Sequence, residues 1–283
     1  MATRTPQLRI DKRSAHRWNV TFDHPPLNLI DPDTIRGLLA LVGELETDSE
    51  VRVVVFDSAD PDFFLAHYDI TWDPADTISM PADGPTGMHP WLDALARLSS
   101  APVVSIAKVQ GRARGAGSEF VLACDMRFAS RERAVLAQLE VGLGLVPGGG
   151  PMHRLPYLVG RGRALEILLA SNDFNGELAE RYGYVNRAVP EAEIDEFVDT
   201  IADRIASFDK SALAETKHHV DEVTLADYAL MPAALDEFWR SVAREGAQRR
   251  LGQAIKDGLQ SRSEVELDTG HYLAGLDAAS SGK

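Results

Sequence analysis

The chain has 283 residues, of which 45% are hydrophobic and 25% are charged, and its formal net charge is −14 at pH 7. This length supports a sizeable buried core and exceeds that of a typical compact domain, so we expect a main domain with a smaller one appended. The composition excludes a disordered chain, and the negative charge disfavours non-specific binding of nucleic acids. No apolar run approaches the roughly 18 residues of a membrane span, so we also expect no membrane partner.

The first residues and the cysteine content indicate the compartment. Residues 1–13 are polar and mixed in charge, without the apolar centre of a secretory signal, and Cys124 is the sole cysteine. We therefore expect a cytoplasmic protein without an internal disulfide. Cys124 follows a run of apolar residues, which predicts a buried and unreactive thiol.

An alternation of strand and helix patterns predicts an α/β core in the first part of the chain. The sequence Asp31-Pro32 opens a helix whose apolar residues recur on one stripe. Another short helix is expected over residues 119–123. Runs rich in β-branched and aromatic residues predict strands at residues 16–22, 51–56, 102–109, 126–129 and 134–137.

From residue 162 onward, helical spacing dominates. Helices are expected over residues 164–170, 176–182, 191–207, 211–222 and 232–259. The expected domains are therefore residues 1–200, an α/β core that carries the active site, and residues 201–283, a helical region for oligomerisation. The last residues are polar and are expected to fray.

Residues 71–90 contain four prolines and two glycines, which predicts a long loop. A loop of this length inside a compact domain is either functional, as a lid or specificity wall, or disordered. The large apolar side chains that flank it either line a pocket or belong to the ordinary core: Trp72, Met80, Met88, Trp91 and Leu92.

Two acidic residues lie beside glycine-rich backbone. Glu119 ends the segment Gly111-Arg-Ala-Arg-Gly-Ala-Gly-Ser-Glu119, and Glu140 precedes Pro147-Gly-Gly-Gly150 by a short apolar run. A pair of carboxyl groups is able to divide acid and base catalysis, and a helix that begins near Ala116 leaves free N–H groups for an oxyanion. An acid in the first turn is also favoured by the helix dipole alone, so Glu119 by itself does not define a site.

Other site chemistries fit the sequence poorly. Gly111, Gly115 and Gly117 have the GxxxGxG spacing of short-chain dehydrogenases, but no tyrosine is followed four residues later by lysine. The histidines form neither an HExxH motif nor a cluster with cysteine, so no metal is expected, and no GxSxG motif is present.

A basic segment lies within this acidic chain. Residues 108–163 contain nine Lys or Arg and four Asp or Glu. This local surplus either attracts an anionic ligand or, as for Arg127, Arg131 and Arg133, only forms a hydrated surface.

Taken together, several motifs resemble the enoyl-CoA hydratase/isomerase family, or crotonase superfamily, over about residues 8–260. They are His24-Pro-Pro-Leu-Asn28, Phe63-Phe-Leu-Ala-His-Tyr-Asp-Ile70, the glycine segment ending in Glu119, the segment from Gln138 through Glu140 to Gly150, and Tyr182-Gly-Tyr-Val-Asn-Arg187. The resemblance implies an α/β crotonase-like (ClpP/crotonase) spiral of ββα units with a C-terminal helical trimerisation region. It also implies a homotrimer or hexamer, an acyl-CoA substrate, and no cofactor besides the coenzyme A of that substrate.

The resemblance also assigns roles. The backbone N–H groups of Tyr68 and Ala116 would form an oxyanion hole, and Glu119 and Glu140 would be catalytic. Substrate binding would involve Ala66, His67, Asp69, Ile70, Gly115 and Leu143, with Lys217 and Arg244 as candidates for a basic residue that contacts the CoA phosphates.

Because the hydratases of this family use two glutamates, the presence of both acids favours an enoyl-CoA hydratase. The alternatives are an isomerase or an acyl-CoA hydrolase of the same superfamily, and a non-catalytic scaffold or RNA-associated protein with this fold. One departure concerns His67, which stands where the family has glycine. It is a benign replacement, a sign of new chemistry, or a sign of lost activity.

Overall fold

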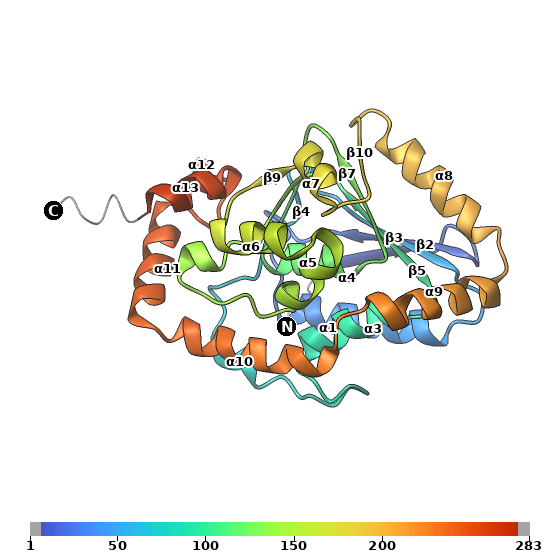
Figure 1. Ribbon diagram of the computed structural model, residues 1–283, viewed down its shortest axis with the longest axis horizontal. Helices are drawn as coiled ribbons and strands as arrows, with labels where there is room; N and C mark the ends of the chain where they lie inside the picture. The colour runs from blue at the N-terminus through green and yellow to red at the C-terminus, as the bar shows by residue number, and fades with distance from the viewer. Residues whose placement is uncertain (1–6, 277–283) are drawn as a thin grey trace, which may run out of the picture.

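The computed structural model describes residues 7–276 and contains two sheets surrounded by helices (Figure 1). The six-stranded sheet has the order β1-β2-β3-β5-β7-β10, with only the β1–β2 pair antiparallel. Its strands are β1 (Leu8–Asp11), β2 (Arg17–Phe22), β3 (Val53–Ser58), β5 (Val104–Val109), β7 (Met126–Ser130) and β10 (Arg187–Val189). The four-stranded sheet has the order β4-β6-β8-β9, made of β4 (Phe63–Leu65), β6 (Arg112–Arg114), β8 (Val135–Ala137) and β9 (Phe174–Asn175).

Helices cover both faces of the larger sheet. Val54 and Phe56 of β3 belong to the core that contains residues of α1 (Pro32–Thr47), α3 (Pro90–Ser100) and α4 (Ala116–Ala123). The alternate residues Val53 and Val55 pack in a separate core with α8 (Ile194–Ala206). Burial on both faces explains why this strand reads as an uninterrupted apolar run, as is typical of parallel sheets.

The smaller sheet determines where the loops after its strands meet. β4, β6 and β8 are parallel neighbours, so their carboxyl ends lie at the same edge. The pairing continues one residue beyond the strands, because the N–H of Arg114 donates to the carbonyl of Ala66 and that of Gly115 donates to the carbonyl of Ala137, both at 3.0 Å. Ligands commonly bind at the carboxyl ends of parallel strands. Residues 66–70, 115–119 and 138–143 all follow this edge.

A turn near residue 28 fixes the first of these loops. Asn28 has a φ of +55°, and its side-chain amide donates to Ser58 Oγ at 2.8 Å and to the carbonyl of Phe63 at 3.2 Å. The next residues pair with the loop itself: the N–H of Ile30 donates to the carbonyl of His67 at 2.9 Å. The sequence motif around Asn28 therefore acts as a support for residues 66–69.

The C-terminal helices wrap the molecule along its lower edge and up its left-hand side in Figure 1. Between the core and this region lie η1 (Val141–Leu143), α5 (Pro151–Val159), α6 (Arg161–Ala170) and α7 (Gly176–Tyr182). The wrap consists of α9 (Lys210–Thr224), η2 (Tyr228–Leu230), α10 (Met231–Val242), α11 (Glu245–Asp257), α12 (Glu264–Leu267) and α13 (Thr269–Gly275).

The prediction of one helix over residues 232–259 is wrong, because Arg244 has extended backbone (φ −69°, ψ 135°) between α10 and α11. This break turns α11 so that Ala247 and Ala254 join a core with Leu139 and Leu143. Helices α12 and α13 were not expected from the sequence. The expected fraying of the last residues falls at 277–283, outside the described residues.

The segment 71–90 is not wholly irregular, since it contains the short helix α2 (Pro74–Ile78), which Asp73 caps through the N–H of Ala75.

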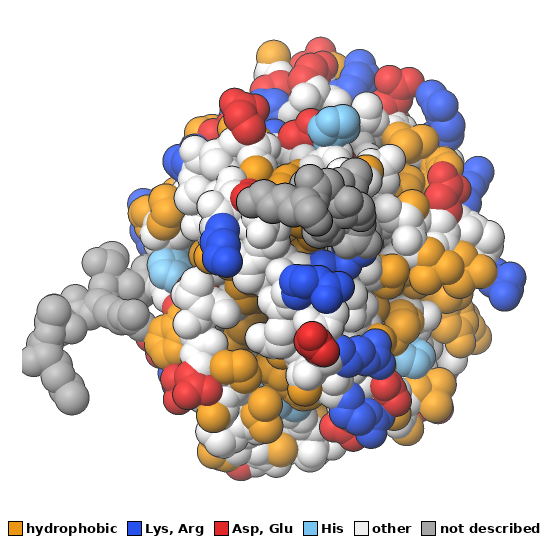
Figure 2. Space-filling model, turned by 90° about the vertical axis from the view of Figure 1, so that its left-hand side faces the viewer, with side chains coloured by type: hydrophobic (Ala, Val, Ile, Leu, Met, Phe, Trp, Pro, Cys, Tyr) orange, Lys and Arg blue, Asp and Glu red, His pale blue; other side chains and the backbone are white. Residues whose placement is uncertain are grey.

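Within residues 7–276, none of the helices has the length and apolar character needed to cross a bilayer. On the face shown in Figure 2, several basic side chains lie near the centre, with a few acidic side chains among them.

Several basic residues of the segment 108–163 are internal. Arg114 is fully buried and its guanidinium pairs with Asp173. Arg127 is buried and donates to the carbonyls of Cys124 and Tyr184, so the prediction of a hydrated surface is wrong for Arg127. Cys124 is 3% exposed, and burial raises the pKa of its thiol, which confirms the prediction of a buried thiol.

The contact between α4 and β4 gives a first prediction. A Cβ atom at Gly117 would lie 2.0 Å from the carbonyl oxygen of Leu65, which is backbone and has little freedom to move. We expect Gly117→Ala to reduce the free energy of unfolding by about 1–3 kcal/mol, measured by urea unfolding. The matched control is Gly252→Ala inside α11, where nothing lies within 4 Å and alanine should stabilise by about 0.5–1 kcal/mol. Equal effects of the two substitutions would contradict this account.

Candidate active site

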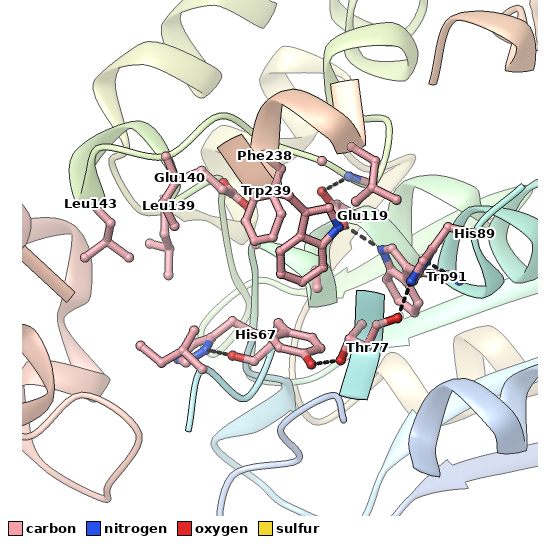
Figure 3. Close-up of a pocket in the computed structure, with 18 of the residues that line it drawn as sticks. His67, Thr77, His89, Trp91, Glu119, Leu139, Glu140, Leu143, Phe238 and Trp239 are labelled. Atoms are coloured by element: carbon pink, nitrogen blue, oxygen red, sulfur yellow. Dashed lines mark hydrogen bonds between the residues drawn. The ribbon is translucent and has the colours of Figure 1, made fainter. Parts of the chain in front are cut away.

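A cavity of about 100 Å³ lies where β4, β6 and β8 end, and side chains from several elements converge on it (Figure 3). Leu139, Glu140 and Leu143 lie at one end of the view, and His89 and Trp91 lie at the other. Of the site residues predicted from the sequence, eight line the cavity: His67, Tyr68, Ile70, Gly115, Ala116, Glu119, Glu140 and Leu143.

Two predicted binding residues do not line this cavity. Ala66 is fully buried and its N–H donates to the carbonyl of Asn28 at 3.2 Å. The N–H of Asp69 donates to the carbonyl of Ile30 at 2.8 Å, and its carboxylate accepts hydrogen bonds from Thr71. Both residues hold the loop in place, and their expected part in substrate binding stays a prediction.

Two backbone N–H groups on the wall remain available to a ligand. Ala116 is the first residue of α4, where helical N–H groups have no partner within the helix. The carbonyl of His67 accepts from Ile30, and in a trans peptide the N–H of Tyr68 points the opposite way. Within residues 7–276, neither N–H donates to another backbone or side-chain group. Both N–H groups are therefore free to donate, as the donors of an oxyanion hole must be.

The backbone at the two bends explains their residue types. Gly115 has φ +48° and ψ −123°, a conformation that glycine adopts more readily than other residues. His67, in contrast, is absent from the non-glycine residues with positive φ, which in the described part of the chain are Asn28, Ser171 and Gln260. The side chain at position 67 therefore requires no unusual backbone conformation.

Glu119 is held by two N–H donors. Its side chain is 3% exposed, and its Oε1 accepts from the N–H of Gly149 at 2.6 Å while its Oε2 accepts from Nε1 of Trp91 at 2.9 Å. Gly149 must lack a side chain, because a Cβ there would lie 1.9 Å from Oε2 of Glu119. Burial raises the pKa of Glu119, whereas these donors and the charge of Arg154 oppose the rise.

Glu140 is buried with one of its carboxyl oxygens unpaired within residues 7–276. It is 8% exposed, and its Oε2 has no hydrogen-bond partner among the described residues. Burial and the charge of Glu119 raise the pKa of Glu140 to about 8. Because the charge of Glu119 acts on Glu140, the two carboxyls titrate as a pair, and we assign the ionised member to Glu119, which the N–H donors of Trp91 and Gly149 hold. Unequal environments of this kind separate a base from an acid.

The far end of the cavity is built mostly by residues that carry no motif in the sequence. Tyr68 and Thr77 are hydrogen-bonded through their hydroxyls, and Nε2 of His89 lies 2.8 Å from the carbonyl of Thr77. Burial lowers the pKa of His89, which favours a neutral ring. Phe238 and Trp239 of α10 also line the cavity (Figure 3). The loop 71–90 thus contributes to the wall through Thr77 and His89, as its specificity-wall alternative requires.

Among the apolar residues that flank this loop, only Trp91 lines the cavity. Trp72 and Met80 line a separate hollow beside α1, and Met88 and Leu92 pack against residues of α10.

The two basic residues suggested for the CoA phosphates do not line the cavity either. Lys217 pairs with Asp125 at 2.8 Å, and Arg244 is exposed at the start of α11. In residues 7–276, no three His, Cys, Asp or Glu side chains are grouped to hold a metal ion.

Comparison with known proteins identifies relatives over most of the chain. A profile of the family described as Enoyl-CoA hydratase/isomerase matches residues 14–237. The short-chain-enoyl-CoA hydratase of Clostridium acetobutylicum is 35% identical over 190 residues, which cover 66% of this chain and 71% of that protein.

Solved structures of relatives share the fold. The crystal structure of a proposed enoyl-CoA hydratase from Streptomyces avermitilis has a TM-score of 0.90 and 46% identity, and the match covers 97% of this chain and 98% of that one. An enoyl-CoA hydratase from Mycobacterium avium subsp. paratuberculosis has a TM-score of 0.75 and 25% identity, covering 87% and 96% of the two chains. These matches confirm the predicted crotonase-like α/β fold with helices in the C-terminal part.

The raised pKa of Glu140 predicts a pH-dependent stability. Its folded pKa of about 8 exceeds the ordinary value of 4.5, so the folded state binds more protons between these values, and the free energy of unfolding should fall as pH rises through this range. We expect Glu140→Gln to reduce this slope, measured by urea unfolding at pH 5, 6.5 and 8. Glu44→Gln, at a half-exposed side chain, is the control. A wild-type slope that Glu140→Gln leaves unchanged would refute the assignment.

Proposed function

The chain belongs to the enoyl-CoA hydratase/isomerase family, and we propose that it adds water across the 2,3 double bond of an acyl-CoA thioester. One observation carries this proposal: two buried carboxyls in unequal environments line the same cavity as two unpaired backbone N–H groups. Hydration needs a base for water, an acid for the α carbon, and donors for the developing enolate oxygen. The cavity holds all of these groups.

In the proposed reaction, the N–H groups of Tyr68 and Ala116 bind the thioester oxygen and polarise the double bond. Ionised Glu119 takes a proton from water while the water oxygen bonds to the β carbon, and the π electrons move toward the thioester oxygen as an enolate. Glu140 then gives its proton to the α carbon. Transfer of one proton from Glu119 to Glu140 restores the starting state. The loss of one oxyanion donor typically costs about 2.7–4 kcal/mol.

The cavity also supports a short acyl group. Its volume is about 100 Å³, and a cavity of roughly 150 Å³ accommodates benzene. Trp91, Phe238 and Trp239 close the space around Glu119, which leaves little room for a long chain (Figure 3). The curated relative from Clostridium acetobutylicum is named a short-chain-enoyl-CoA hydratase, which agrees with this size.

The catalytic roles predict the effect of two isosteric substitutions. We expect Glu119→Gln and Glu140→Gln each to lower kcat for crotonyl-CoA by about 10²–10⁴-fold, because each removes one proton-transfer group and retains the side-chain volume. Binding of crotonyl-CoA, measured by calorimetry, should change little. Near-normal turnover in both variants would overturn the roles.

Product analysis separates the hydratase from its nearest alternatives. Incubation with a 2-enoyl-CoA should give the 3-hydroxyacyl-CoA, with no free thiol released. Interconversion of 2-enoyl-CoA and 3-enoyl-CoA without uptake of water would indicate an isomerase, and release of free CoA would indicate a hydrolase. Each of these outcomes replaces the proposed reaction and keeps the family.

The cavity size predicts the dependence on acyl length. In a series of trans-2-enoyl-CoA substrates from four to ten carbons, we expect kcat/KM to be highest at four and to fall by at least tenfold by eight. The aromatic wall should cause this fall, so Trp239→Ala should shift the optimum to longer chains. A flat series in the wild type would exclude a short-chain preference.

Assembly and cofactor use remain parts of the proposal. Coenzyme A would enter with the substrate and the reaction would need no other cofactor. A homotrimer or a pair of trimers is expected from the family, and light scattering on the purified protein would measure it.

A further inference from the structure

His67 has an acceptor at each ring nitrogen. Its Nδ1 lies 2.9 Å from the carbonyl oxygen of Tyr68, and its Nε2 lies 3.2 Å from Oε2 of Glu266 in α12. The histidine side chain is 9% exposed and that of Glu266 is 0% exposed. Neither residue takes part in the reaction described above, although His67 lines the cavity.

The chemistry of these partners determines the protonation of the ring. A carbonyl oxygen and an ionised carboxylate have lone pairs only, so each accepts a hydrogen bond and donates none. Both ring nitrogens of His67 must then carry hydrogen, which makes the ring an imidazolium cation.

Both ring contacts would be hydrogen bonds with a neutral ring only if Glu266 were protonated, and three groups favour its carboxylate. Oε2 of Glu266 also accepts the N–H of Gln260 at 2.8 Å, and the cations of His67 and Arg114 lie near it. The pKa of Glu266 is lowered despite its burial, because of His67, Gln260 and Arg114. An ionised Glu266 and a charged His67 therefore form a mutually compensated buried pair.

We propose that His67 is a buried imidazolium held by Glu266, that this pair fixes the loop carrying the Tyr68 N–H, and that its charge makes Glu140 a stronger acid. The first two statements concern the ground state of the protein. The third rests on the proposed hydration.

The positioning role follows from contacts between residues 67–68 and the C-terminal segment. The carbonyl of Tyr68 accepts from Nδ1 of His67 and from Nε2 of Gln260, the latter at 3.0 Å. Gln260 and Glu266 belong to one segment, which Arg114 of β6 also binds through the carbonyl of Glu266 at 2.7 Å. The C-terminal segment therefore links the loop that carries the Tyr68 N–H to β6, the strand that precedes Ala116.

The electrostatic role follows from the position of Gly115. A Cβ atom there would lie 3.1 Å from Oε1 of Glu140 and 3.5 Å from Cβ of His67, so the two side chains flank the same glycine. When Glu140 gives its proton to the α carbon, it becomes a carboxylate in a buried site. A nearby cation stabilises that carboxylate and opposes the rise in the pKa of Glu140 that burial causes.

Three ionisable groups face His67: Glu266 of α12, Glu140 before η1, and Arg114 of β6. The pKa of His67 is raised: burial lowers it, but the charge and hydrogen bond of Glu266 and the hydrogen bond to Tyr68 outweigh burial. The folded pKa therefore exceeds 6.5, and the stabilisation by the cation is complete below 6.5 and is lost as pH rises through the folded value.

NMR of the imidazole nitrogens tests the charged state without requiring turnover. At pH 7, a histidine with the ordinary pKa of 6.5 would be only about one quarter protonated. We expect both nitrogens of His67 to be largely protonated at this pH in the intact protein, and the Nε2 proton to be lost in Glu266→Gln. An unprotonated Nε2 at pH 7 in the wild type would overturn the proposal.

His24 provides a reference in the same spectra. Its Nδ1 lies 2.9 Å from the carbonyl of Leu29, but its Nε2 lies 3.2 Å from the side-chain amide nitrogen of Gln7, which is a donor. The partners of His24 therefore require a neutral ring with the proton on Nδ1, and the two histidines should differ in the signal of Nε2.

Kinetics test the effect on Glu140. Without the cation, the pKa of Glu140 should rise, so Glu266→Gln should lower kcat about tenfold and move the alkaline limb of the kcat profile to higher pH. His67→Gln should also move the alkaline limb of the kcat profile to higher pH. This variant tests the electrostatic role if Glu266→Gln does not fold. A lower rate with an unmoved limb would leave the pair a purely structural role and refute the electrostatic one.

A second His–Glu pair supplies the matched control. Glu222 lies 3.0 Å from Nδ1 of His219 on the exposed face of α9, outside the cavity. Glu222→Gln should leave kcat and its pH profile unchanged. If the protein does not hydrate enoyl-CoA at all, the NMR result still decides the charged state of His67, so failure of the function and failure of this inference are distinguishable.

Discussion

The parallel pairing of β4, β6 and β8 is the constraint on which the site depends. Parallel strands have their carboxyl ends at the same edge of a sheet. Here the segments that follow β4, β6 and β8 contain Tyr68, Glu119 and Glu140. The close approach of Gly117 to the Leu65 carbonyl locks the start of α4 against the end of β4. Tyr68 and Glu140, which are 72 positions apart in the sequence, thereby line one cavity.

Burial gives the resulting cavity its chemical asymmetry. Removing two carboxyls from water raises the pKa of both. N–H groups from Gly149 and Trp91 and the charge of Arg154 oppose this rise at Glu119, whereas at Glu140 the charge of Glu119 adds to it, and backbone hydrogen bonds and the charge of His67 oppose it. The glycines after residue 147 are needed because backbone must reach the first carboxylate. The C-terminal segment adds Glu266, which pairs with His67 on the cavity wall.

The sequence predicted the family, the fold and eight of the residues on the cavity wall, because these depend on local motifs: glycines at bends, an acid in a first helical turn, and apolar strands. It did not predict the contacts between distant segments. Thr77, Phe238 and Glu266 carry no local signal, since their roles arise from the folding of α2, α10 and α12 against the core. The single helix predicted over residues 232–259 was too long because the helical spacing of apolar residues continues through Arg244. The break there depends on the packing of Ala247 against the core, which the sequence does not show.

The hydrogen bond between His67 and Glu266 of α12 has a consequence for biosynthesis. Glu266 follows Glu140 by 126 residues, so a ribosome completes the strands, both proposed catalytic acids and the oxyanion bends long before it reaches the partner of His67. The nascent core must bury or hydrate an uncompensated imidazole until then. A message truncated ahead of α12 would thus yield a chain that contains every proposed catalytic residue and lacks the finished site.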